Sequence, residues 1–364
     1  MNKAKKERSS FVFMSEKYFL GSFSPEGFKG SFGEEIKKSD FKTVILKGGA
    51  GTGKSSLMKK VSAHFKDKDE VVEFYCSSDP NSLDAVLLKS RKRIIVDGTS
   101  PHIFEPTFPG VKEKILNLGD CWDERKLCVS SDKIIDITKE HKKHMERTKR
   151  YVKALSSIFQ DTYSIAYESI LTSKLNGFVE RLIKKLAVKK SNENGEISTR
   201  QLSALTPQGY KTLTDTLEDY EVFLLKDSFF AGSDMILKAL SDIFVSRGKD
   251  VFVSPLNIFD NTVYEHILIP QLKLAFISSN PLTTLKLENV KVINVHRFYD
   301  KQFISQRKAR LKLNKKACCD LTLEASRSMK TALKIHDELE KYYILAMDFD
   351  KVGKLCQKTI EDFR

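Results

Sequence analysis

The sequence predicts an α/β fold that occurs twice in tandem, each copy being a parallel sheet with flanking helices followed by a long helical extension. Three observations predict it. A short apolar segment, residues 41–47, precedes a glycine-rich stretch and then apolar residues at helical spacing. Related segments recur about 180 residues later. Each copy ends in a stretch typical of long helices, residues 124–189 and 301–363.

Length and composition permit two domains and exclude several classes of protein. The chain has 364 residues, of which 41% are hydrophobic, so wholesale disorder is excluded. Six cysteines without a CxxC pair exclude a small disulfide-stapled scaffold. The first 20 residues lack the apolar core of a signal peptide, and no stretch approaches the roughly 18 apolar residues of a membrane span. We therefore expect a cytoplasmic protein with reduced thiols.

The glycine-rich stretch predicts a phosphate-binding loop. Residues 48–55 read GGAGTGKS, which matches the P-loop or Walker A pattern G-x-x-x-x-G-K-[ST]. Glycines let successive backbone N–H groups converge on phosphate oxygens, and the following helix points its positive end at the anion. Lys54 would reach the β- and γ-phosphates, and Ser55 would bind Mg²⁺. The expected nucleotide-binding residues are Gly48, Gly49, Ala50, Gly51, Thr52, Gly53, Lys54, Ser55 and Ser56.

A second buried strand is expected to supply the carboxylate that holds Mg²⁺ through its water shell. Residues 93–98 read RIIVDG, in which three β-forming residues precede Asp97. Asp97 is therefore a Walker B-like candidate metal partner beside Ser55, and the alternative is an aspartate that caps the strand end. Many P-loop ATPases carry a glutamate directly after this aspartate, but here the position is Gly98. A partner would have to supply the missing carboxylate, or else Asp79, Asp84 or Glu105.

The segment between these motifs, residues 71–84, predicts a strand that ends in a polar turn and starts a short helix. Ligands of parallel α/β sheets bind beyond the carboxyl ends of the strands, so Asp79 would face the nucleotide. There it would orient water or accept a proton from a substrate hydroxyl, which makes it a candidate catalytic residue with Lys54 and Asp97. The alternative is an Asx-turn that caps the helix.

The second half repeats the first at an offset of 177–182 residues. The lead-in SPEGF at 24–28 recurs as TPQGY at 206–210, and VILK at 44–47 recurs as FLLK at 223–226. A carboxylate in a polyphosphate cradle repels the ligand, so we expect a degenerate second half with a structural, regulatory or partner-binding role. The substitutions that predict this are Gly48 to Asp227, Lys54 to Ser233, Ser55 to Asp234 and Asp97 to Ile277.

A domain boundary is expected in the polar stretch 189–200, which has no apolar run. The predicted domains are residues 1–195, a P-loop NTPase-like domain with an intact Walker A motif and a helical extension, and residues 196–364, its degenerate repeat with a second extension.

The net charge of +14 suggests an anionic partner without naming it. Basic residues cluster at 141–150, 181–190 and 301–316, all in stretches expected to be helical. These clusters are either solvated helix faces or a groove for nucleic acid or another polyanion. His141 and His144 lie on the first of them, where a basic face is a better interpretation than a metal site.

The motif set resembles an uncharacterised bacterial family, mostly from Firmicutes, of duplicated P-loop ATPases. The resemblance rests on ILKGGAGTGKSSLMKK, YCSSDPNSLD, IIVDGTSPH and NLGDCWDE. It implies an intracellular protein with ATP or GTP and Mg²⁺ as cofactors, and importance for Asp79, Asp84, His102 and Trp122. Members often keep a lysine in the second loop, from which Ser233 and Asp234 depart.

Three functions fit these motifs. The first is hydrolysis of ATP or GTP at the first half only, which drives or gates a movement of the helical segments. The second is a small-molecule kinase that uses Asp79 as a base. The third is a nucleotide-gated binding module without hydrolysis. Strand order would separate the first two, because it shows whether the Asp97 strand neighbours the P-loop strand; base preference and oligomeric state stay open.

Overall fold

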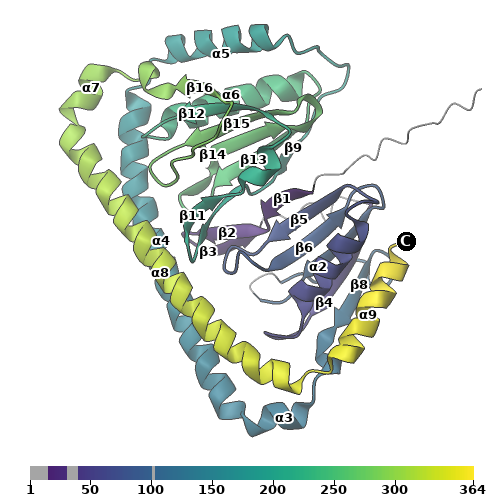
Figure 1. Ribbon diagram of the computed structural model, residues 1–364. Helices are drawn as coiled ribbons and strands as arrows, with labels where there is room; N and C mark the ends of the chain where they lie inside the picture. Colours follow the sequence, from purple (N-terminus) through teal and green to yellow (C-terminus); the bar gives the residue numbers. More distant parts are fainter. Residues whose placement is uncertain (1–14, 31–39, 101–102) are drawn as a thin grey trace, which may run out of the picture.

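Two similar six-stranded sheets form the centre of the protein (Figure 1). The computed structural model describes residues 15–30, 40–100 and 103–364. The first sheet contains β1 (Glu16–Phe19), β4 (Lys42–Lys47), β5 (Val71–Tyr75), β6 (Leu83–Leu88), β7 (Arg93–Asp97) and β8 (Glu113–Asn117). The second contains β9 (Ile197–Thr199), β12 (Glu221–Lys226), β13 (Val251–Leu256), β14 (Asp260–Ile269), β15 (Leu274–Ser279) and β16 (Lys291–Asn294).

The strand order is the same in both sheets, which confirms the duplicated α/β fold. The first runs β1-β5-β6-β7-β4-β8, and the second runs β9-β13-β14-β15-β12-β16. The edge strand β9 comes from the polar stretch that was expected to be only a linker, and it pairs in parallel with β13. Each member of one sheet therefore has a counterpart in the other, at the same place and in the same order.

The sheets are mixed, so the expectation of a purely parallel sheet was wrong. Strand β6 runs antiparallel to both β5 and β7, and β14 does the same between β13 and β15. The segment 71–84 was expected to end in a turn that starts a short helix, but residues 83–88 are all buried and form the inner strand β6. A short apolar run does not distinguish a buried strand from a buried helical segment, and here the gap between β5 and β7 decides.

The strand that leads into residues 48–55 has the Asp97 strand as its direct neighbour. Strand β4 pairs in parallel with β7 on one side and with β8 on the other. Leu46 lies opposite Asp97, so the ends of these strands open at the same edge of the sheet.

A small hairpin follows the edge strand β1 or β9 of each half and keeps the same turn. The hairpins are β2 (Gly21–Ser24) with β3 (Gly27–Gly30), and β10 (Ser203–Thr206) with β11 (Gly209–Thr212). Ser24 Oγ donates to the carbonyl of Gly27 at 2.8 Å, and Thr206 Oγ1 donates to the carbonyl of Gly209 at the same distance. The recurring sequence lead-ins therefore mark one repeated structure.

Helices cover the outer faces of the sheets. Helix α2 (Lys54–Phe65) follows β4 and buries Leu57, Val61 and Phe65, the face expected from their spacing, and α6 (Ala231–Ser246) is its counterpart. The opposite faces of the two sheets meet in one core that includes Ile45 and Leu224. The extensions contain α3 (Glu124–Val129), α4 (Ser131–Glu168), α5 (Thr172–Leu186), α7 (Lys301–Gln306), α8 (Lys308–Ala346) and α9 (Phe349–Asp362).

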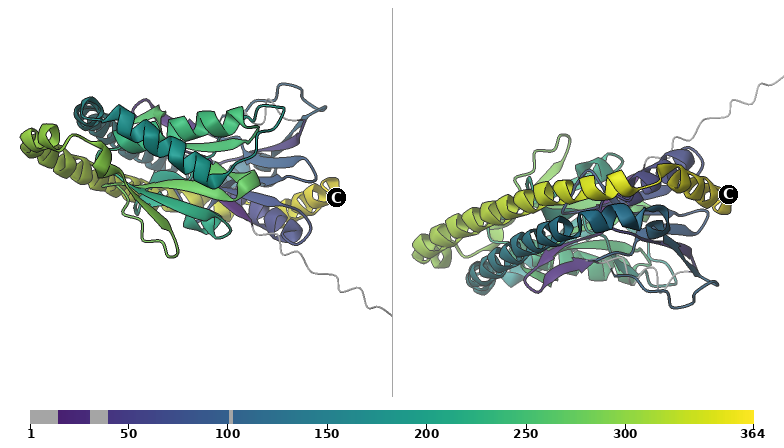
Figure 2. Two further views of the ribbon diagram at one scale, coloured as in Figure 1. Left: turned by 90° about the horizontal axis from the view of Figure 1, so that it is seen from above. Right: turned by 90° about the horizontal axis from the view of Figure 1, so that it is seen from below.

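The long helices α4 and α8 lie side by side along one edge of the molecule (Figures 1 and 2). The last helix of each extension packs on the other half of the protein. Helix α5 packs on α6 of the second half, where Leu175 and Val179 join its core. Helix α9 packs on α2 of the first half, where Ile360 and Phe363 join the core. Each such buried side chain contributes about 1.5–3 kcal/mol, so each half depends on a helix from the other extension.

None of the helices in the described part of the chain is both long and apolar enough to cross a lipid bilayer.

Candidate functional site

The glycine-rich loop connects β4 to α2 at the carboxyl edge of the first sheet. Gly51 and Gly53 have φ angles of +65° and +88°, which residues with a Cβ atom rarely adopt. Thr52 Oγ1 donates to the carbonyl of Gly49 at 3.0 Å and closes the turn. The residues expected to bind nucleotide thus form this loop and the first turn of α2, where Ser56 is exposed.

Lys54 and Asp97 come together beside this loop. Lys54 Nζ lies 3.7 Å from Asp97 Oδ2 and donates to the carbonyls of Gly48 and Gly49 at 2.9 and 2.7 Å. Asp97 Oδ1 accepts from the backbone N–H and the hydroxyl of Thr99. Burial raises the pKa of Asp97, while Lys54 and the Thr99 hydrogen bonds act in the opposite direction. Lys54 and Asp97 thus form a nearly buried ion pair, in which each side chain positions the other.

Strand β6, which the sequence interpretation missed, brings two further groups to this site. The backbone N–H of Leu83 donates to Ser55 Oγ at 3.0 Å, so the hydroxyl expected to bind Mg²⁺ is oriented by the start of β6. The next residue, Asp84, is buried, and its charge adds to the rise in the pKa of Asp97. Asp84 is therefore a second carboxylate close to the Lys54–Asp97 pair.

Asp79 and Glu105 have other partners. Asp79 accepts from the backbone N–H of Asn81 at 3.2 Å and from Ser82 Oγ at 2.5 Å, in the turn that joins β5 to β6. Within the described residues, no hydrogen bond or ion pair joins it to Lys54 or Asp97. Its contacts are those of the Asx-turn alternative. Glu105 is exposed and pairs with Lys47 at 2.7 Å.

Residues from the far end of the chain cover the glycine-rich loop. The backbone N–H of Gly51 donates to Glu340 Oε1 on α8 at 3.2 Å, across 289 positions of sequence. A Cβ at Gly51 would lie 2.8 Å from the carbonyl oxygen of Glu340, so the helix approaches this closely only because the residue is glycine. Tyr343, one turn further along α8, packs against Trp122 with ring centroids 5.7 Å apart. The sequence pattern gave no signal for these contacts.

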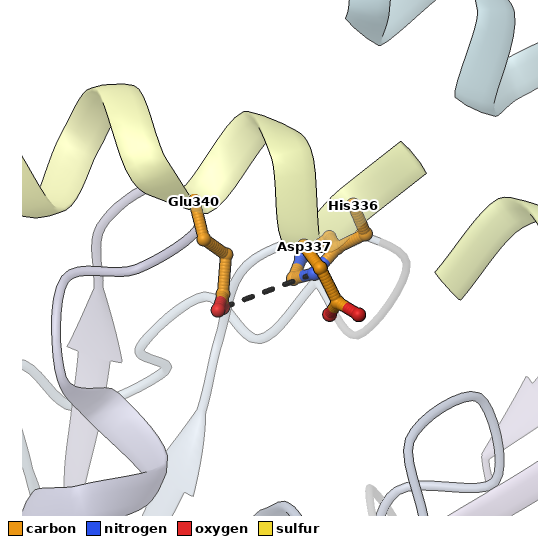
Figure 3. Close-up of side chains that lie close together, drawn as sticks. All are labelled: His336, Asp337 and Glu340. Carbon is orange, nitrogen blue, oxygen red and sulfur yellow. Dashed lines mark ion pairs between the residues drawn. The ribbon is translucent and has the colours of Figure 1, made fainter. Parts of the chain in front are cut away.

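Glu340 belongs to a cluster with His336 and Asp337 on the same helix (Figure 3). His336 Nδ1 and Glu340 Oε1 form an ion pair at 3.8 Å, and one ligand atom of each of the three residues lies within 4.8 Å of the others. The His141 ring on α4 lies 5.9 Å from the His336 ring, and burial lowers the pKa of His141 to about 4. Imidazole and carboxylate ligands suit a divalent cation. However, the Glu340 oxygen that pairs with His336 also accepts the hydrogen bond from the backbone N–H of Gly51.

The second half keeps one left-handed residue of the loop, starts its helix α6 two residues earlier and fills the loop with its own side chain. Phe230 has a φ of +67° where Gly51 has +65°. Asp227, which corresponds to Gly48, is 2% exposed and accepts from the backbone N–H groups of Phe229 and Ser233 at 2.9 and 2.8 Å. It also accepts from the hydroxyl of Tyr299. The N–H groups that would face a phosphate are thus occupied by a carboxylate of the same loop.

Asp234 occupies the position that corresponds to Ser55, but it has a carboxylate in place of the hydroxyl. It accepts from the backbone N–H of Tyr264 at 2.7 Å, as Ser55 accepts from Leu83, and from the hydroxyl of Tyr163 at 2.6 Å. The strand register corrects one correspondence expected from the sequence. Leu225 lies opposite Ser278 where Leu46 lies opposite Asp97, so the counterpart of Asp97 is Ser278 and not Ile277. The shift is a single residue, and the carboxylate is absent from this position in both alignments.

His102, which the resemblance marks as important, lies outside the described residues. No protein-family model matches the chain, and neither a curated protein nor a solved structure shows significant similarity to it. The resemblance to duplicated P-loop ATPases therefore stays a prediction, and the function has to be argued from the site.

Proposed function

We propose that the first half binds a nucleoside triphosphate, ATP or GTP, together with Mg²⁺, and that binding is coupled to helices α8 and α9. The observation that supports this best is the meeting of Lys54 and Asp97, 3.7 Å apart, at the start of α2. A lysine, the N–H groups of a glycine-rich loop and a helix N-terminus suit a polyphosphate. The oxygens of Ser55 and Asp97 suit a hard divalent cation.

The coupling to α8 follows from competition for one hydrogen-bond donor. The N–H of Gly51 donates to the carboxylate of Glu340, and a phosphate oxygen in the loop would need the same N–H. Two anions at this place repel each other, so a bound nucleotide displaces Glu340. Its side chain is 37% exposed and has room to leave. Occupancy of the loop would therefore loosen α8 from the first half, and hydrolysis would restore the contact.

For the chemical step, Asp84 is the best-placed carboxylate. Position 98 lacks the glutamate that orients water in many P-loop ATPases, and Asp79 is held in its turn. Asp84 is buried at the start of β6, next to the residue that orients Ser55. We assign it the role of orienting the attacking group. Phosphoryl transfer depends mainly on positioning and on neutralising charge, which Lys54 and Mg²⁺ would supply.

A small-molecule kinase is the second candidate, and the strand order favours it. In kinase-like P-loop sheets, the strand before the loop and the strand that carries the metal-associated aspartate are neighbours, as β4 and β7 are here. Asp84 would then orient the acceptor hydroxyl. ADP formation measured with and without a panel of hydroxyl-bearing metabolites separates the two functions, since only a kinase responds to its acceptor.

Lys54→Ala tests nucleotide binding itself. We expect a loss of affinity for a fluorescent ATP analogue of at least about 100-fold, because the lysine is the main cation of the cradle. The circular dichroism spectrum should stay that of the folded wild type, whereas the melting temperature should fall because the nearly buried Asp97 loses its ion-pair partner. Lys59→Ala, at an exposed position of the same helix, is the matched control and should bind normally. Unchanged affinity in Lys54→Ala would overturn the proposal.

A further inference from the structure

A cavity of about 280 Å³ lies in the second half beside the degenerate loop. Its wall includes Phe229 and Phe230 from the loop, which correspond to Ala50 and Gly51, and Pro281 and Leu282, which follow β15. In the first half the equivalent place is the candidate nucleotide site. Ligands of α/β sheets bind at this edge, beyond the carboxyl ends of the central strands. The cavity therefore occupies a ligand position whose phosphate chemistry has been lost.

The inner wall of the cavity suits an apolar ligand. Two phenylalanines have replaced small loop residues, and Leu311 of α8 adds an aliphatic side chain. The polar groups of the old cradle face one another, because Asp227 accepts from the N–H groups of Phe229 and Ser233. A polyphosphate would find no ready donors there, whereas apolar surface gains about 25 cal/mol per Å² on leaving water.

The mouth of the cavity is positively charged. Lys308, Lys312 and Lys315 border it from successive turns of α8, a spacing that places them on one face of the helix. All three are exposed, and no ion pair joins any of them to another residue in the described ranges. The acid on the adjacent helix, Asp161, is already paired with Arg310. These lysines are part of the basic cluster at 301–316 that the nucleotide site does not use.

We propose that this cavity binds a small amphipathic anion, with an apolar body inside and one negatively charged head group at the three lysines. A water occupies about 30 Å³, and a methylene group is of similar size, so the cavity accommodates a body of roughly ten heavy atoms. This volume lies just below the usual range of ligand pockets, about 300–1,000 Å³, which fits a small ligand. The inference does not depend on nucleotide binding by the first half.

Isothermal titration calorimetry of the full chain tests this with octanoate, 4-phenylbutyrate, 1-octanol and acetate. We expect one molecule of octanoate or phenylbutyrate to bind per chain with a Kd below about 1 mM, and acetate not to bind. The tighter of the two carboxylates shows whether the body is aliphatic or aromatic. Failure of both to bind below about 1 mM, or equal binding of acetate, would overturn the proposal.

Two sets of variants locate the ligand. The triple variant Lys308→Gln, Lys312→Gln, Lys315→Gln should weaken carboxylate binding on the order of tenfold and leave the weaker binding of octanol unchanged, since each exposed ion pair is worth up to about 1 kcal/mol. The matched triple variant Lys316→Gln, Lys330→Gln, Lys334→Gln removes the same charge from α8 outside the cavity and should bind normally. Equal weakening in both would indicate a nonspecific charge effect and reject the site.

A cavity-filling variant gives an independent reading. Ser228 lines the cavity and is only partly buried, so Ser228→Trp should fill the space without removing a charge. We expect it to abolish octanoate binding while its melting temperature and its affinity for ATP stay near the wild-type values. Wild-type octanoate affinity in a folded Ser228→Trp protein would place the ligand elsewhere and contradict the proposal.

Discussion

The two loops at residues 48–55 and 227–234 hold the same place between strand and helix, and they differ in where their anion comes from. In the second half the anion is internal, because Asp227 turns into its own loop and is 2% exposed. In the first half it is Glu340, which reaches the loop from another helix and is 37% exposed. The comparison shows that one loop is closed by its own carboxylate, while its duplicate is held by a carboxylate from a distant helix.

The difference extends to the neighbouring strands. Asp84 and Glu265 occupy equivalent positions on β6 and β14, and both are buried. Glu265 is satisfied by the hydroxyl of Tyr210 at 2.6 Å and by the amide of Asn280 at 2.9 Å. Asp84 instead lies beside the ion pair of Lys54 and Asp97. The acid at this position is therefore hydrogen-bonded within the core of the second half as Glu265, and it lies beside charged groups in the first half as Asp84.

The largest effect is expected where the internal anion is removed. Asp227→Ala should destabilise the protein by about 3–5 kcal/mol, because the buried N–H groups of Phe229 and Ser233 and the hydroxyl of Tyr299 lose their acceptor. Urea unfolding measures the change, and Asp242→Ala, at an exposed position of α6, is the control. A loss below about 1 kcal/mol would mean that Asp227 is not the element that fills the second loop.

The second effect is a pH dependence of stability at Glu265. Burial raises the pKa of this carboxyl from 4.5 to about 7. The folded state then holds the proton more tightly than the unfolded state, so stability falls as pH rises from about 4.5 to 7. Glu265→Gln removes this pH-dependent contribution to the free energy of unfolding. We expect the difference in unfolding free energy, variant minus wild type, to rise by on the order of 3 kcal/mol from pH 4 to pH 8. Urea unfolding at both pH values checks this, and a constant difference would contradict it.

The third effect separates Asp84 from Asp79 in the first half. If Asp84 orients the attacking group, Asp84→Asn should lower the rate of ADP formation by about 100-fold, in the range of general acid–base contributions, with ATP affinity nearly unchanged. Asp79→Asn is the matched control, and we expect less than a twofold change because its contacts lie within a turn. The reverse order of the two rates would return the catalytic role to Asp79.

The smallest effect is expected at Glu340, which we propose a bound nucleotide displaces. Glu340→Gln should tighten ATP binding about fivefold, since the neutral amide competes less well than a carboxylate for the N–H of Gly51. Fluorescence titration measures the affinity, with Glu338→Gln at an exposed position of α8 as the control. Weaker ATP binding in Glu340→Gln would show that Glu340 supports the nucleotide rather than competing with it.

Much of the site was predictable because its signals are local. The order of strand, glycines, lysine and helix depends on residues next to one another, and the structure places Lys54 and Asp97 together as Walker A and Walker B-like motifs imply. Strand β6 was missed because LDAVLL is short and, apart from Asp84, apolar, so its period is ambiguous. That error also hid the orientation of Ser55 and favoured Asp79 over Asp84.

The sequence by itself determined the duplicated α/β fold, the glycine-rich loop and the half that keeps its lysine, because repeats and short motifs depend on neighbouring residues. Only the tertiary structure decided that α9 completes the first half, that Glu340 holds Gly51, and that a lysine-rimmed cavity lies beside the second loop. These contacts depend on how two helices of 38 and 39 residues pass each other. Side-chain spacing gives the buried face of a helix but not the partner that covers it.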